Sequence, residues 1–138
     1  MELYRASVAA VPNDDRVLAN LGDGLWHAEG PEVAKVVYAE VLELARSNLE
    51  INPNDVDHLQ SVIIAAGSLG DEDLLQTTLQ FAVEAAPQNP PNFYRAAVAY
   101  MRLGESDLAL EYATQAIELG YPRPLVELDA DLKVLFEN

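Results

Sequence analysis

The sequence contains no cysteine among its 138 residues, which excludes disulfide bridges and thiolate metal sites. It also lacks any apolar run of roughly 18 residues, the length that a membrane-spanning helix needs. Its first residues include an acid at the second position and no long apolar stretch, unlike a secretory signal peptide. We therefore expect a cytoplasmic protein without a membrane partner.

Basic residues are scarce. The sequence has 8 Lys and Arg residues against 23 Asp and Glu residues, and its formal net charge is −15. Such a surface repels phosphate backbones and anionic lipids at long range, so we expect no nucleic-acid partner. The acidic surface aids solubility, and adaptation to a salty habitat is a second interpretation of it.

Alanine and leucine dominate the apolar residues, which favours helices. The stretches 58–87 and 92–121 match at a constant offset of 34 residues, and their apolar residues recur with the helical period. Each stretch has one break, where Gly70 or Gly104 is followed by acids that suit the start of a helix. The other matching pairs are Leu59 and Phe93, Val62 and Ala96, Leu75 and Ala109, Leu79 and Ala113, and Ala82 and Ala116. Each stretch is therefore predicted to form a helix, a tight turn and a second helix.

The order of small and large residues in 94–122 has a simple interpretation. Two antiparallel helices that pack closely need small residues where their backbones approach. We expect Ala97, Ala109 and Ala116 at these positions, with larger side chains such as Tyr100 filling the space around them.

This pattern resembles the tetratricopeptide repeat (TPR), whose period is also 34 residues. In the unit 90–121, Phe93 and Tyr100 stand at aromatic positions of the family, Gly104 at its turn glycine and Ala109 at a small position of the second helix. The resemblance implies an all-α fold. The chain would be a TPR-like, right-handed α-solenoid of antiparallel helix pairs with a C-terminal capping helix.

The resemblance makes 1–138 a single TPR domain with a half-repeat at its start. That half-repeat exposes an unpaired helix, through which we expect a possible homodimer. The closing segment and one unusually long second helix also resemble the C-terminal TPR arrays of bacterial multidomain signalling proteins. The implied parts are 1–12 (second helix of a partial repeat), 15–53 (repeat with an extended second helix), 56–87 and 90–121 (repeats), and 124–136 (capping helix).

Motifs that could support catalysis or bind a metal are incomplete. The segment 52–57 is like the start of a calcium loop, but Asp57 stands where the loop needs glycine and Ile63 where it needs glutamate. The two histidines, His27 and His58, are not in metal-ligand spacing. We therefore expect no catalytic residues, no metal and no cofactor.

The resemblance implies that the first helices of the repeats line a concave groove that binds a peptide or a partner domain. There we expect Tyr94, Met101 and Trp26 to supply apolar contacts, and Arg95 and Arg102 to orient an acceptor group. The family's carboxylate clamp is not expected, because only Arg95 matches it. The groove positions are Arg16, Asn20, Asp23, Trp26, His27, Gln60, Ser61, Ile64, Tyr94, Arg95, Val98, Met101 and Arg102.

The expected function is thus that of a non-catalytic protein–protein interaction module or scaffold, not an enzyme. The narrower resemblance places it in a bacterial signalling or regulatory protein. A small TPR chaperone of the secretion type is the alternative within the family. A small enzyme is the alternative from a different class.

Overall fold

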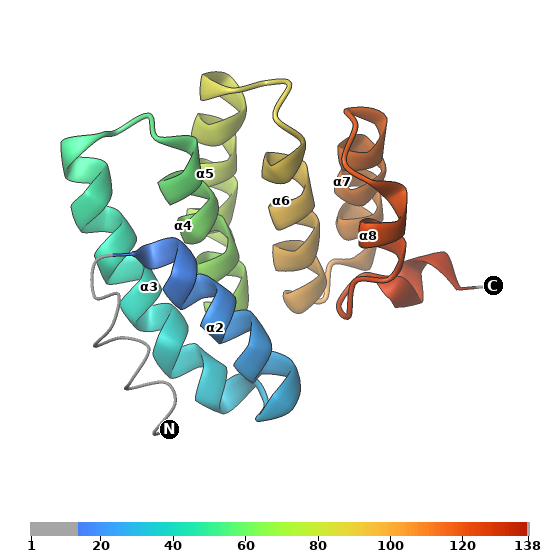
Figure 1. The fold of residues 1–138 in the computed structure, drawn as a ribbon, viewed down its shortest axis with the longest axis horizontal. Helices are drawn as coiled ribbons and strands as arrows, with labels where there is room; N and C mark the ends of the chain where they lie inside the picture. The colour runs from blue at the N-terminus through green and yellow to red at the C-terminus, as the bar shows by residue number, and fades with distance from the viewer. Residues whose placement is uncertain (1–13, 138) are drawn as a thin grey trace.

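The computed structural model describes residues 14–137, and all regular secondary structure in that range is helical (Figure 1). The prediction of an all-α protein is confirmed for this part of the chain. The half-repeat expected over 1–12 lies outside the described residues. The elements are α2 (Asp15–Ala28), α3 (Pro31–Ile51), α4 (Val56–Leu69), α5 (Glu72–Ala85), α6 (Pro90–Arg102), α7 (Ser106–Glu118), α8 (Arg123–Glu127) and the 3-10 helix η1 (Lys133–Phe136).

Short polar side chains start most of these helices. Asp14, Asp55, Asp71 and Asn89 each precede a helix and accept hydrogen bonds from backbone N–H groups of its first turn. A glycine with positive φ ends α4, because Gly70 has a φ of 85°, which disfavours side chains with a Cβ. The boundaries of the helices therefore follow from local chemistry.

The helices adjoin one another in sequence order. α2 contacts α3, α4 contacts α5 and α6 contacts α7, and the two helices of each pair run in opposite directions (Figure 1). The second helix of one pair contacts the first helix of the next, and α4 also lies against both α2 and α6. The first helices α2, α4 and α6 thus form a row.

Small residues set the distance between α4 and α6. A Cβ added to Gly67 would lie 2.6 Å from the Cα atom of Ala99, so only glycine fits there. Ala97, Ala109 and Ala116 are all fully buried. The alternation of small and large side chains in the sequence thus corresponds to close contacts between helices.

α3 is longer than its counterparts, with 21 residues against 14 in α5 and 13 in α7. Its inner side is apolar, since Val37, Val41 and Ala45 are fully buried. Tyr38 is equally buried, but its hydroxyl reaches Asp23 on α2 and enters the site described below. A side chain of a second helix thus contacts the row of first helices.

The segment 124–136 differs from the single capping helix expected there. It consists of the short helix α8, a turn and η1. In the turn, the Asp129 carboxylate accepts hydrogen bonds from the backbone N–H groups of Asp131 at 2.8 Å and Leu132 at 3.2 Å. This local bonding competes with helix continuation, and the resulting turn directs Leu132 into the core, where it is fully buried.

Candidate functional site

The row of first helices carries the predicted groove residues, and the structure places most of them in one of two places. One is a pocket of about 350 Å³, here called the open pocket. The other is a group of side chains around the guanidinium of Arg102, here called the Arg102 cluster. The open pocket is lined by Asp14, Arg16, Val17, Ala19, Asn20, Asp57, Gln60, Ser61, Ile64 and Arg95. The Arg102 cluster consists of Asp23, Trp26, His27, Tyr38, Ser68, Arg102 and Asp131.

The open pocket is bordered by ion pairs that solvent reaches. Arg16 Nη1 lies 3.2 Å from Asp57 Oδ2, and both side chains are more than half exposed. Arg95 donates to Asp23 Oδ2 at 2.9 Å and to Asn20 Oδ1 at 3.4 Å. The exposed Arg16–Asp57 pair contributes about 0–1 kcal/mol, so a ligand group can replace one of the two partners at little cost.

Gln60 lines the open pocket and is held there by α6. Its Nε2 donates to Asn92 Oδ1 at 2.8 Å and to Asn89 Oδ1 at 3.2 Å. Asn92 is itself fully buried and donates to the backbone carbonyls of Ala82 and Ala86. The amide of Gln60 is therefore committed to linking α4 with α6, and it shapes the pocket wall through this link.

The Arg102 cluster is buried, whereas the open pocket is exposed to solvent. Only 2% of the Arg102 side chain is exposed. Its Nε and Nη2 donate to the two carboxylate oxygens of Asp131 at 3.1 and 3.0 Å, which is a bidentate pair. Its Nη1 donates to Ser68 Oγ at 2.8 Å, to the Tyr38 hydroxyl at 2.7 Å and to Asp23 Oδ1 at 3.3 Å. All the nitrogens of the guanidinium thus have acceptors.

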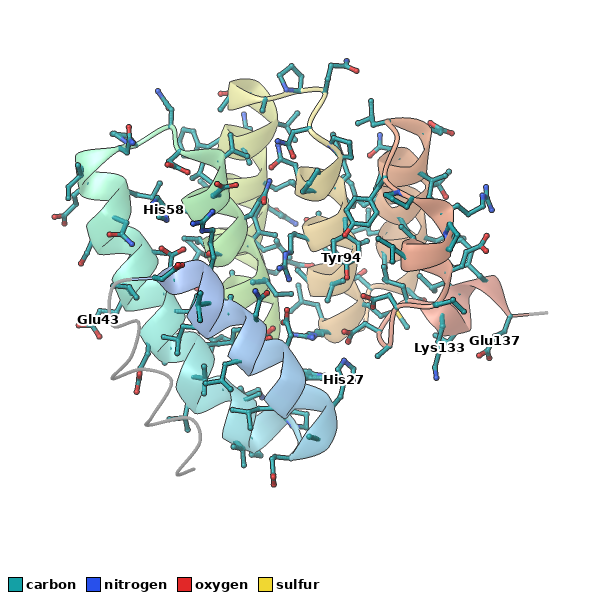
Figure 2. All side chains as sticks on the ribbon, viewed as in Figure 1. His27, Glu43, His58, Tyr94, Lys133 and Glu137 are labelled. Carbon is teal, nitrogen blue, oxygen red and sulfur yellow. The ribbon has the colours of Figure 1, made fainter. Side chains whose placement is uncertain are left out.

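Aromatic rings and a histidine complete the Arg102 cluster. The guanidinium carbon lies 4.4 Å from the ring centroid of Trp26, a cation–π contact, and the Trp26 ring meets Tyr38 edge-on. His27 projects from the last turn of α2 (Figure 2), and its Nε2 lies 3.0 Å from Asp131 Oδ2. One carboxylate of the C-terminal part of the chain therefore contacts both α2 and α6.

Burial and charge set the protonation of the cluster. Burial by itself lowers the pKa of Arg102, but the hydrogen bond to Asp131 and the nearby Tyr38, Asp131 and Asp23 raise the pKa by more. Burial, followed by the charge of Asp23, raises the pKa of the Tyr38 hydroxyl well above its usual value. The guanidinium therefore stays charged, and the Tyr38 hydroxyl stays protonated and donates to Asp23.

Tyr94 connects α6 to the same C-terminal part of the chain (Figure 2). Its hydroxyl donates to Asp129, and its ring stacks on Tyr121 with the ring centroids 4.6 Å apart. Burial raises the pKa of Tyr94, and the hydrogen bond to Asp129 raises it further. Tyr94 is thus occupied by an intramolecular contact.

These contacts correct the expectation that all the predicted residues face an open groove. His27, Tyr94 and Arg102 contact residues after α7, which fold back onto the first helices. Trp26 contacts Tyr38 and Arg102. Val98 is buried, and Met101 packs against the core. The predicted residues that line the open pocket are Arg16, Asn20, Gln60, Ser61, Ile64 and Arg95, of which Ser61 and Ile64 are themselves almost fully buried.

Sequence reasoning missed three members of these contacts: Tyr38, Asp129 and Asp131. Tyr38 lies on a second helix, where no groove residue was expected. Asp129 and Asp131 lie in the segment interpreted as a cap. The one available signal was the pair of aspartates two residues apart in an otherwise apolar segment.

A second buried charged group links three helices at the other end of α2. Asp15 is fully buried, and its Oδ1 lies 2.7 Å from His58 Nδ1 on α4 and accepts from Asn48 Nδ2 on α3 at 2.8 Å. This arrangement places an aspartate beside a histidine. It ties α2 to α3 and α4 below the open pocket.

Residues 14–137 contain no group of three His, Asp or Glu side chains placed to hold a metal ion. In the same range, every helix is too short or too polar to cross a membrane. No protein-family model matches the sequence, and no curated protein matches it. Function is therefore inferred from the geometry of the chain itself.

Proposed function

We propose that this chain is a non-catalytic protein–protein interaction module that binds an extended peptide segment of a partner along α2, α4 and α6. The sequence-order packing of the helix pairs supports a TPR-like α-solenoid, right-handed as in that family, with the first helices on its concave side. The observation that carries the proposal is the open pocket, to which all three first helices contribute.

The chemistry of the open pocket suits a peptide. Its rim holds Arg16 in weak pairs with Asp14 and Asp57, and Asn20 adds an amide that can accept or donate. An extended peptide presents backbone N–H and C=O groups together with side chains, and such groups can replace the rim pairs one by one. Val17, which lines the pocket and is exposed, supplies an apolar surface against which a partner side chain can pack.

The proposal includes the setting in which the module acts. The formal charge of −15 disfavours nucleic acid and anionic membranes as partners, so we place the partner among proteins. By its resemblance to the C-terminal arrays of bacterial signalling proteins, the module would serve as a scaffold in a cytoplasmic regulatory protein.

Selection of random peptides displayed on phage tests the proposal directly. The full chain is immobilised, and the enriched peptides are synthesised and titrated by calorimetry. Asn20→Arg adds a long side chain on the wall of the pocket and should weaken the selected peptides by about tenfold or more, equivalent to ~1.4 kcal/mol.

Ser47→Arg is the matched control. It adds the same side chain and the same charge at an exposed position of α3 that does not line the pocket. The selected peptides should bind this variant as they bind the unchanged chain. Failure to enrich any peptide, or equal loss of binding in both variants, would contradict the proposal.

A further inference from the structure

The C-terminal segment (residues 128–137) lies against the first helices and is held there through two aspartates. Asp129 accepts from the Tyr94 hydroxyl. Asp131 accepts from two nitrogens of Arg102 and lies at hydrogen-bond distance from His27. The polar contacts therefore depend on one short acidic motif, Asp-Ala-Asp, while the buried Leu132 and the partly buried Leu135 and Phe136 supply the apolar ones.

The backbone of the C-terminal segment is bonded only locally. Its described backbone–backbone hydrogen bonds all end on carbonyl groups of residues 124–132, and none joins it to α2, α4 or α6. The segment can therefore move away from the first helices while these hydrogen bonds stay intact. In this respect the segment resembles a separate peptide that is held in a groove by its side chains.

If the segment left, part of the Arg102 guanidinium would lose its hydrogen-bond acceptors. The Nε and Nη2 atoms of Arg102 would lose their acceptors, while Nη1 would keep Tyr38, Ser68 and Asp23. A buried guanidinium without a partner on one side is strongly disfavoured. A carboxylate with bidentate geometry would restore both hydrogen bonds, next to the ring of Trp26.

We propose that the Arg102 cluster is a second binding site, specific for an aspartate of an acidic peptide, and that the C-terminal segment occupies it as an intramolecular ligand. This inference rests on the proposed groove function and adds its regulation. A partner's acidic segment would displace residues 128–137 and lie next to the open pocket, so the tethered segment limits binding to partners that can compete with it.

Because the C-terminal segment is attached to the same chain as the site, it competes with any peptide that is added. A segment attached to the same chain competes at an effective concentration in the millimolar range. A free peptide of the same sequence should therefore bind the unchanged chain poorly. It should bind well once the attached segment is weakened but the site itself is unaltered.

The test uses a synthetic peptide with the sequence of residues 128–137. The peptide contains no tryptophan, whereas Trp26 is the single tryptophan of the chain and contacts Arg102, so its fluorescence reports occupancy of the site. Asp131→Asn in the full chain should raise the affinity for this peptide by about tenfold or more. A peptide with asparagine in place of Asp131 should not bind.

Glu127→Gln is the matched control, because it removes one charge close in sequence from a residue whose partner is the exposed Arg123. This variant should behave like the unchanged chain. Absence of peptide binding to a folded Asp131→Asn chain, or equal binding of both peptides, would overturn the proposal.

Hydrogen exchange of the unchanged chain decides the matter even if Asp131→Asn does not fold. Backbone amides of Leu132, Lys133 and Leu135 should exchange by local opening, at least about tenfold faster than those of α6. Exchange only through global unfolding would overturn the proposal. If the peptide-binding test or the exchange test gives the negative result but the open pocket still selects peptides, the proposed function stands and only the second site is rejected. Failure of peptide selection alone would reject the open pocket instead.

Discussion

The open pocket and the Arg102 cluster lie on the same row of helices and both contain arginine–aspartate pairs, yet they differ in solvent exposure. The side chains of Arg16 and Asp57 are 57% and 58% exposed, whereas those of Arg102 and Asp131 are 2% and 9% exposed. The exposed pair is weak because water screens it. The buried pair is costly to break because each charge has lost its water.

The comparison shows that exposure, more than residue type, decides what an arginine does on this surface. Arg16 borders a pocket and can exchange its exposed partner. Arg102 is enclosed, and two of its nitrogens donate to the carboxylate of Asp131. Three experiments can break or sharpen this contrast, and they follow in order of the expected effect.

The largest effect is expected from Arg102→Ala compared with Arg95→Ala. Loss of Arg102 leaves Asp131 without its bidentate partner in a largely buried site, and should lower the free energy of unfolding by about 3–5 kcal/mol. Arg95 is about a quarter exposed and its partner Asp23 keeps Tyr38 and Arg102 as donors, so its loss should cost less, about 1.5–3 kcal/mol. Urea unfolding followed by circular dichroism measures both. Equal losses would show that the two sites do not differ as described.

A smaller effect is expected from Gly67→Ala, which disturbs both sites because it pushes α4 away from α6. The new Cβ would lie 2.6 Å from the Cα of Ala99, and relief of such overpacking costs about 1–3 kcal/mol. Gly24→Ala is the matched control, since a Cβ there meets no atom within 4 Å. It should stabilise α2 by about 0.5–1 kcal/mol. Thermal melting of the two variants should therefore shift in opposite directions.

The smallest effect concerns alkaline pH. Burial raises the pKa of Tyr100 to about 12, and the pKa values of Tyr38 and Tyr94 are raised as well. Because the folded state holds these protons more tightly than the unfolded state, the stabilisation is complete below about pH 10 and is lost as the pH rises towards the folded pKa values.

The free energy of unfolding should therefore fall between pH 10 and the folded pKa values. The change affects the Arg102 cluster through Tyr38, whereas no tyrosine lines the open pocket. Tyr100→Phe should reduce the steepness of this fall. Stability that is flat across this range, or unchanged steepness in the variant, would contradict the burial argument. Urea titrations at several pH values give the measurement.

The helices themselves could be predicted because their signals are local. Capping residues such as Asp14 and Asp55 precede helices, and Gly70 ends one, wherever the rest of the chain lies. The prediction of one helix over 124–136 was wrong because it used apolar spacing alone. There, the Asp129 side chain offers the backbone an alternative partner, which spacing does not reveal.

The candidate site could be predicted only in part. The resemblance to the repeat family placed Arg16, Asn20 and Arg95 on first helices, and the structure brings them together around one pocket. The partner of Arg102 could not be inferred in this way. Asp131 follows Arg102 by 29 residues and reaches it only because the chain turns after α8.

The sequence by itself determined that the described part of this protein is helical and where most of its helices begin, because capping and periodicity act over a few neighbouring residues. Only the tertiary structure decided which arginine remains accessible and which is enclosed. Enclosure depends on a carboxylate that arrives from a distant part of the chain, and the loss of water around that pair makes it selective for its partner.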